Sequence, residues 1–391
     1  MAEGAFPAGP IFGFPNYLPR PTASRCFEHD EQPLRSESLL LLSRLSPLGA
    51  RAPVLPFPPA FLGICMFARR NFTRLLSAAV VATPFGVRAA EDYPARPIRL
   101  IVPWPAGGGV DTFGRVIQAA LGAQLGQTII IDNIGGGSGR IGTQAASRAA
   151  ADGYTLLLAN DTFAATEALP IAGTAPLRSA FVPVTLAISG PQGLFTHPKS
   201  GFKSIEDFAA AARARPGQLN VGVPGIGSSQ HLTSELLLKA AGDLKVTHVP
   251  YRGGGPLIQD LLAGNVDVAT VTFAAGAQQV SAGQLVGLGV TTAERQASFP
   301  NIPTIAQTIA SGFVQPTWMG FFAPRGTPED ALRRVRAAAT AALKDPAVAA
   351  RLQDLGFSAV GLDGAAFGRL FDDTVKTFAD IATERQIVAG E

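Results

Sequence analysis

Three glycine-rich stretches in this sequence have the composition and spacing of loops that bind anions. They are AGGGVD at 106–111, GGSGRIG at 136–142 and VPGIGSSQHL at 223–232. Each follows a short apolar run and precedes a segment with helical periodicity, so each is predicted to link a strand to a helix. Such a turn leaves backbone N–H groups available to an anion, and the positive end of the helix dipole favours the negative charge.

The first loop resembles a nucleotide-binding P-loop but lacks the side chains that such a loop needs. Gly109 and Gly114 have the G-x-x-x-x-G spacing, yet Arg115 and Val116 follow instead of Lys and Ser or Thr. The lysine that reaches the phosphates and the hydroxyl that binds Mg²⁺ are both missing. The sequence therefore argues against an ATP or GTP site.

The second loop is a literal G-x-G-x-x-G from Gly137 to Gly142, and Asp161 ends the next expected strand, where a ribose-binding acid would belong. This pattern keeps an exported NAD(P)-dependent oxidoreductase open as an alternative. Two features argue against it. A complete strand–helix unit precedes the loop, and the glycine run looks like a β-hairpin turn.

The third loop could form an anion clamp together with the first. Gly225 and Gly227 allow a close approach of the backbone to a ligand, and Ser228 or Ser229 can cap the following helix. Taken alone, this loop is equally well explained as an ordinary capped helix. If the first loop faces it from another lobe, two helix N-termini can hold a carboxylate without an arginine.

Candidate catalytic and metal-binding residues are few. After residue 89 the histidines are His197, His231 and His248, whose spacing does not match a metal site, and no cysteine is present there. His231 follows Ser229 by two residues without a G-x-S-x-G elbow, which favours a capped helix over a catalytic dyad. We therefore expect no enzyme activity, no metal and no cofactor.

The N-terminal region has the composition of an export signal. Residues 66–89 combine an arginine-rich start, an apolar stretch and small residues at the expected cleavage site, and ARRNF resembles a twin-arginine signal. Residues 1–65 are predicted to be a disordered upstream extension, with a genuine extra segment as the alternative. Residues 90–391 hold 23 basic and 24 acidic residues, so we expect no nucleic-acid partner. The expected location is the periplasm.

Strand-like and helix-like segments alternate from residue 93 onward. This alternation predicts an α/β fold with mixed, mostly parallel sheets and helices on both faces. Because about 300 residues exceed one core, we expect two lobes, residues 90–194 with 316–391 and residues 195–315. One late helix carries strong start signals, with Thr327 expected as its N-cap, Pro328 at its first position and Asp330 completing a capping box.

Six motifs in a fixed order resemble the Bug family, the extracytoplasmic substrate-binding proteins of tripartite tricarboxylate transporters. They are YPARPIRLIVPWPAGGGVDTFGR, DGYTLLLAN, FVPVTLA, ARPGQLNVGVPGIGSSQHL, THVPYRGGGPLIQDLLAGNVDV and WMGFFAPRGTP. The resemblance extends from residue 93 to the C-terminus. It implies a two-lobed, type II periplasmic binding protein that closes by a hinge around a small carboxylate. It also implies a monomer that delivers the ligand to membrane permease subunits.

The resemblance also suggests which residues hold the ligand. The ligand-binding residues that it implies are Trp104, Ala106, Gly107, Gly108, Asp111, Asn160, Thr162, Gly225, Gly227, Ser228, Ser229, His231 and Tyr251. Asp111 could instead cap its helix and shape the loop, and Tyr251 could simply pack on its turn. The chain departs from the family pattern at Arg140, at 161–169 and at 270–272, which bears on the identity of the ligand. A scavenging or sensory protein that serves a receptor is a further alternative.

Overall fold

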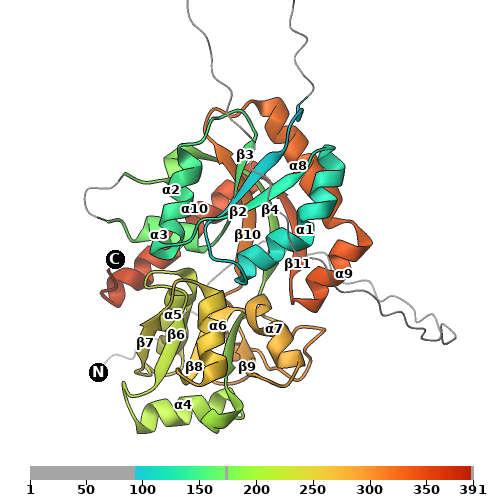
Figure 1. Cartoon of the computed structure of the whole chain (residues 1–391). Coiled ribbons are helices and arrows are strands. Elements are labelled where there is room, and N and C mark those ends of the chain that lie inside the picture. The colour runs from blue at the N-terminus through green and yellow to red at the C-terminus, as the bar shows by residue number, and fades with distance from the viewer. Residues whose placement is uncertain (1–92, 172–174, 389–391) are drawn as a thin grey trace, which may run out of the picture. The chain divides into compact units, whose positions relative to one another are not determined.

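Strands and helices alternate along the chain and build two separate β-sheets (Figure 1). The computed structural model describes residues 93–171 and 175–388. The predicted signal peptide at 66–89 and the upstream segment at 1–65 lie outside these described residues. Among the helices described, none is both long enough and apolar enough to cross a bilayer.

The six-stranded sheet has the order β11-β4-β10-β3-β1-β2. Strand β1, next to the edge strand β2, is parallel to β2 and β3, whereas β10 runs antiparallel between β3 and β4. The strands are β1 (Ile98–Val102), β2 (Ile129–Asn133), β3 (Thr155–Asn160), β4 (Phe181–Gly190), β10 (Thr317–Pro324) and β11 (Ser358–Asp363). The helices are α1 (Gly109–Leu125), α2 (Arg140–Ser147), α3 (Thr162–Ala168), α8 (Glu329–Leu343), α9 (Pro346–Asp354) and α10 (Gly364–Glu384).

Both faces of this sheet are covered, which explains why its strands read as nearly continuous apolar runs. Side chains alternate along β3, so Leu156 and Leu158 pack in one core cluster with Phe113 of α1. Leu157 points the other way and packs in a second cluster with Phe163 of α3. Helices therefore lie on both faces, as the sequence predicts.

The five-stranded sheet has the order β7-β6-β8-β5-β9. Here β6 is parallel to β7 and β8, and β5 is antiparallel to β8 and β9. The strands are β5 (Gln192–Thr196), β6 (Asn220–Val223), β7 (Thr247–Pro250), β8 (Val268–Thr272) and β9 (Val286–Val290). The helices are α4 (Ile205–Ala214), α5 (Ser229–Ala240), α6 (Gly254–Ala263) and α7 (Phe273–Ser281).

The chain passes between the two sheets twice. Pro191 separates β4 from β5, and residues 291–316 lead back from β9 to β10. Thr291 joins the two crossings, because its N–H donates to the Gln192 carbonyl (3.1 Å) and its carbonyl accepts from the Gln315 N–H (2.8 Å). Its hydroxyl also accepts from the Gln192 N–H at 3.0 Å. The two crossings are therefore tied side by side.

The predicted α/β fold class, with mixed sheets and helices on both faces, is confirmed, but parallel pairing is not the majority. Among the described strands, four pairings are parallel and five are antiparallel. The antiparallel pairings arise where β5 and β10 enter a sheet directly from a crossing, and where β11 adds to the edge at β4. Both sheets belong to one compact unit, and the predicted lobe boundaries stay a prediction.

Two local predictions are wrong. The glycine run at 135–139 is not a hairpin turn, because β1 and β2 are parallel and the run leads into α2 through a short 3-10 turn, Gly137–Gly139. Thr327 does not cap α8. Its hydroxyl donates to the Pro324 carbonyl (2.7 Å), and Pro328 occupies the N-cap position without a side-chain cap. Asp330 pairs with Arg333 instead of completing a capping box.

Replacement of Phe322 by alanine tests the packing under α10. Phe322 is fully buried and its ring contacts four other phenylalanine rings. We expect Phe322→Ala to lower the free energy of unfolding by about 3–5 kcal/mol, because the cavity cannot collapse fully. Urea unfolding followed by circular dichroism measures this. Ile130→Ala, at a side chain that is 51% exposed, is the control and should change it by less than about 1 kcal/mol.

Candidate functional site

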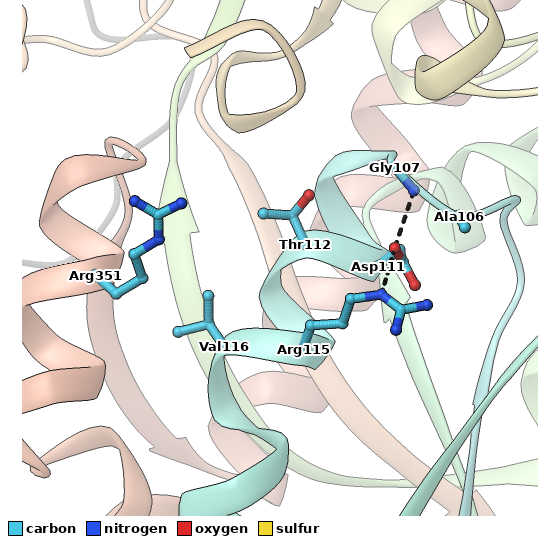
Figure 2. Close-up of a pocket in the computed structure, with 7 residues that line it drawn as sticks. All are labelled: Ala106, Gly107, Asp111, Thr112, Arg115, Val116 and Arg351. Atoms are coloured by element: carbon cyan, nitrogen blue, oxygen red, sulfur yellow. Dashed lines mark hydrogen bonds and ion pairs between the residues drawn. The ribbon is translucent and has the colours of Figure 1, made fainter. Parts of the chain in front are cut away.

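The first glycine loop follows β1 and leads into α1. The carboxylate of Asp111 accepts hydrogen bonds from the Gly107 N–H (2.9 Å), from Arg115 Nε (2.9 Å) and from Asn133 Nδ2 (3.0 Å), as Figure 2 shows in part. Burial alone would raise the pKa of Asp111, but these hydrogen bonds and the charge of Arg115 outweigh it and lower the pKa. Asp111 is therefore an ionised carboxylate that shapes the loop, in line with the second of its two predicted roles.

A second glycine turn, Gly253–Gly255, faces the first loop from the five-stranded sheet. A Cβ atom added at Gly255 would lie 2.7 Å from the Ala106 carbonyl oxygen, and one added at Gly254 would lie 3.7 Å from the Gly108 Cα. At position 255 only glycine permits this approach of the α1 and α6 N-termini. The first loop is thus in direct contact with the turn after β7, and its pairing with the serine loop around a ligand stays a prediction.

A continuous group of buried polar side chains lies between the two sheets, and we call it the polar seam. Its members are Trp104, Asn160, Asp161, Thr162, Ser229, Gln230, Thr272 and Thr317, each no more than 5% exposed. Trp104 Nε1 donates to Asn160 Oδ1 at 3.2 Å, and Asn160 Nδ2 donates to Thr162 Oγ1 at 3.3 Å. These contacts carry the network from the first loop to the start of α3.

Thr162 continues the polar seam into the five-stranded sheet. Its hydroxyl accepts from the Ser229 N–H (3.1 Å), lies 2.9 Å from Ser229 Oγ and donates to Gln230 Oε1 (3.4 Å). Gln230 Nε2 in turn donates to Thr272 Oγ1 at 3.2 Å. A Cβ atom on Gly109 would lie 2.7 Å from the Thr272 Cβ, so the network ends beside the first loop where it began.

Asp161 is the ionisable member of the polar seam. Its Oδ1 accepts from Ser229 Oγ (2.7 Å) in one sheet and from Thr317 Oγ1 (2.9 Å) in the other, while its Oδ2 is buried without a hydrogen-bond partner. Burial raises the pKa of Asp161 to about 7, against the lowering effect of the two hydroxyl groups and of the backbone N–H groups of Asp161 and Thr162. Asp161 is thus held by hydroxyl groups of both sheets through Oδ1.

The serine loop forms the predicted capped helix. Ser228 Oγ accepts from the His231 N–H at 3.2 Å and caps α5, while Ser229 enters the polar seam. Gly225 and Gly227 both have positive φ angles, and a Cβ on Gly225 would lie 2.5 Å from Ser138 Oγ. These glycines therefore permit contact between this loop and the second glycine loop.

The G-x-G-x-x-G stretch is engaged with protein rather than open to a cofactor. Ser138 Oγ donates to the Ile226 carbonyl at 2.9 Å, and the Arg140 guanidinium donates to the carbonyls of Thr166 and Leu169. The preceding strand β2 is also an edge strand, whereas the first strand of a dinucleotide-binding fold lies in the middle of its sheet. This geometry argues against the dinucleotide alternative.

The structure brings together a cluster that the spacing did not reveal. Ligand atoms of His231, Glu235 and His248 lie within 4.8 Å of one another. However, Nδ1 of His231 accepts the Gly227 N–H (3.2 Å), so the neutral ring carries its proton on Nε2, and Arg385 lies 3.6 Å from Glu235. Burial lowers the pKa of His231 to about 4, with a further contribution from His248. This donor set suits a hydrogen-bonded network, not a cation.

Tyr251 and the surface beside the first loop complete the region. The Tyr251 hydroxyl donates to Asp260 Oδ2 at 2.8 Å, which anchors the ring on α6 and supports the packing alternative.

Outside the seam, a surface pocket of about 620 Å³ lies between α1 and α9 (Figure 2). Its lining residues are Ala106, Gly107, Asp111, Thr112, Arg115, Val116 and Arg351. It shares Ala106, Gly107 and Asp111 with the predicted site, but Arg115 is already paired with Asp111.

The predicted site residues divide into three groups in the structure. Trp104, Asn160, Thr162 and Ser229 meet in the polar seam, and Ala106–Gly108 and the serine-loop glycines border it. The remaining residues have side chains bonded to their own loops or helices, and they are Asp111, Ser228, His231 and Tyr251. Sequence reasoning missed Gln230, Thr272 and Thr317 as seam residues. Each of these residues lies at an end of an apolar strand or at the start of a helix, and this position is the sequence feature that could have identified it.

Comparison with known proteins gives this arrangement a family. Residues 113–387 match the model of the tripartite tricarboxylate transporter family receptor. The chain belongs to this family. The receptor is 35% identical over 263 residues to the protein BugT of Bordetella pertussis, in an alignment that covers 66% of the chain and 80% of BugT. The predicted resemblance to the Bug family is thereby confirmed.

Two solved structures are similar to the receptor along nearly their whole length. One is the R. palustris protein Rpa4515 with adipate, with 31% identity and a TM-score of 0.72 over 76% of the receptor and 99% of that chain. The other is MatC from Rhodopseudomonas palustris with bound malate, with 30% identity and a TM-score of 0.68. This alignment covers 74% of the receptor and 99% of MatC. The matching family consists of receptors, which is consistent with a protein that is not an enzyme.

Replacement of Thr162 by valine tests the hub of the polar seam. Valine keeps the shape but leaves the buried Ser229 N–H and Asn160 amide without their acceptor. We expect Thr162→Val to lower the free energy of unfolding by about 1–3 kcal/mol, measured by urea unfolding. Thr383→Val, on the exposed face of α10, is the matched control and should be within about 0.5 kcal/mol of the wild type. Equal effects of the two variants would contradict the role given to Thr162.

Proposed function

We propose that this receptor is an exported solute-binding protein that captures a small carboxylate between its two sheets. The observation that carries the proposal is the polar seam, a buried set of hydroxyl and amide groups reached by the N-termini of α1, α3, α5 and α6. Helix N-termini and neutral donors can hold a carboxylate without a basic side chain. The similar proteins solved with adipate and with malate support this ligand class.

Binding is proposed to proceed by hinge closure. The tied crossings at Thr291 act as the hinge, and each sheet with its helices moves as one lobe, residues 90–194 with 316–391 against residues 195–315. The closed lobes bury the ligand at the polar seam and present one surface to the membrane subunits of a tripartite tricarboxylate transporter. Export through the signal at 66–89 would place the receptor in the periplasm. A sensory or scavenging role uses the same binding event and differs only in the partner.

A thermal-shift screen of the purified protein tests the ligand class. We expect a mono-, di- or tricarboxylate, an aromatic acid or an amino acid to raise the melting temperature. A ligand present at 100 times its Kd adds about 2.7 kcal/mol to the stability of the folded state. Sugars, metal cations and NAD(P) are the controls and should leave the melting temperature unchanged. A shift with NAD(P) and none with any carboxylate would support the oxidoreductase alternative instead.

Replacement of Gly255 by alanine tests closure. The new methyl group would lie 2.7 Å from the Ala106 carbonyl and would keep the two glycine turns apart. We expect Gly255→Ala to weaken binding of the best carboxylate about tenfold or more, equivalent to about 1.4 kcal/mol. The melting temperature without ligand should fall as well, because the same methyl group disturbs a contact that is present in the structure described, so binding is compared well below that temperature. Calorimetry measures the Kd, and Gln259→Ala on the exposed face of α6 is the control. Unchanged affinity in Gly255→Ala would show that binding does not need this approach.

A further inference from the structure

The polar seam lacks a positive charge to balance Asp161. Its other members are neutral hydroxyl, amide and indole groups. A buried carboxylate without a cation is unfavourable, because an ionised group removed from water needs a charge partner or several hydrogen bonds. Asp161 receives two hydroxyl donors on Oδ1, whereas Oδ2 is buried without a partner. Half of the carboxyl group is therefore unsatisfied as an acceptor.

Charged groups on the elements around Asp161 are committed elsewhere. On α2, Arg140 donates to the carbonyls of Thr166 and Leu169, and on α3, Glu167 accepts from the N–H groups of Leu177 and Arg178. On α5, Glu235 lies 3.3 Å from His248 and 3.6 Å from Arg385, which follows α10. His231, also on α5, stays neutral because its pKa is about 4. The strands β3 and β10 carry no ionisable side chain.

The two hydroxyl donors of Asp161 come from different sheets. Thr317 belongs to β10 beside Asp161, whereas Ser229 begins α5 in the five-stranded sheet. Separation of the sheets would remove Ser229 and admit water to the carboxyl group. Closure would reverse both changes, so the ionised form of Asp161 is disfavoured in the closed state relative to the open state.

We propose that the receptor captures its carboxylate ligand together with one proton, which Asp161 takes up from solvent on Oδ2 as the two sheets close. This inference rests on the proposed function and adds a second, pH-dependent component to binding. The proton removes the repulsion between two buried anions. It also converts Oδ2 from an unpartnered acceptor into a hydrogen-bond donor to the ligand.

The direction of the pH dependence follows from the pKa of Asp161 in each state. Burial raises it to about 7 in the structure described, where the two sheets are in contact, and water would lower it toward an ordinary aspartate pKa of about 4 once the sheets separate. The protonated form is therefore favoured on closure, and binding weakens as the pH rises between these two values. Above about pH 8 the affinity should be independent of pH.

Calorimetric titration of the full protein with malate and with adipate at pH 6, 7 and 8 tests the proposal. We expect the Kd of the acid that binds to be about tenfold lower at pH 6 than at pH 8. Titrations at pH 6 in two buffers of different ionisation enthalpy should show uptake of about 0.9 proton per ligand. Binding with a constant Kd and no proton uptake would overturn this inference and leave the proposed function intact. A lack of binding of both acids at every pH would overturn the inference for dicarboxylates, whereas the carboxylate function fails only if no carboxylate raises the melting temperature in the thermal-shift screen.

Asp161→Asn provides the matched variant, because its amide keeps the size of the side chain and does not titrate. We expect it to bind with a Kd that changes less than twofold between pH 6 and pH 8 and to show no proton uptake. Asp380→Asn, on the exposed face of α10, should retain the wild-type pH profile. A different pair of results would overturn the proposal. If the wild type binds an amino acid without proton uptake and Asp161→Asn loses this binding, then Asp161 holds the ammonium group of the ligand instead. If Asp161→Asn does not fold, the proton count of the wild type decides.

Discussion

Polar groups that lose water between the two sheets must find hydrogen-bond partners in the opposite sheet, and the rest of the structure is arranged around this constraint. Thr162 and Ser229 meet across the boundary, and Asp161 receives one donor from each side. Glycines at 109, 225 and 255 let the surrounding backbone come close enough for these short contacts. A bulkier loop would leave the same groups buried and unpaired, at a cost of about 1–3 kcal/mol each.

The fold was accessible from sequence because strands, helices and their order depend on local patterns. The apolar runs at β1 and β3 and the periodicity of α1 identify their elements without tertiary information. The direction of strand pairing was not accessible, since β10 joins β3 and β4 from more than a hundred residues away. The cap of α8 was missed for a related reason, because the Thr327 hydroxyl is used by the turn that begins at Pro324.

The candidate site was predictable in its loops but not in its contacts. Glycine and serine next to a helix start indicate a loop that can approach a ligand, and Trp104, Asn160, Thr162 and Ser229 do meet. Which loop faces which depends on the relative placement of the sheets, so the pairing of the first loop with Gly253–Gly255 could not be read from the chain. Asp161 entered the sequence analysis as a possible ribose ligand. Its environment, including an oxygen without a partner, exists only in the folded protein.

The double crossing between the sheets has a consequence for the order in which the chain can fold during synthesis. The five-stranded sheet is made from one uninterrupted stretch, from β5 at residue 192 to β9 at residue 290. The six-stranded sheet, by contrast, lacks the strand between β3 and β4 until residues 317–324 have emerged. Because domains form as their segments are translated, the part encoded in the middle can complete its sheet first. The part that contains both ends of the described chain must wait for its central strand.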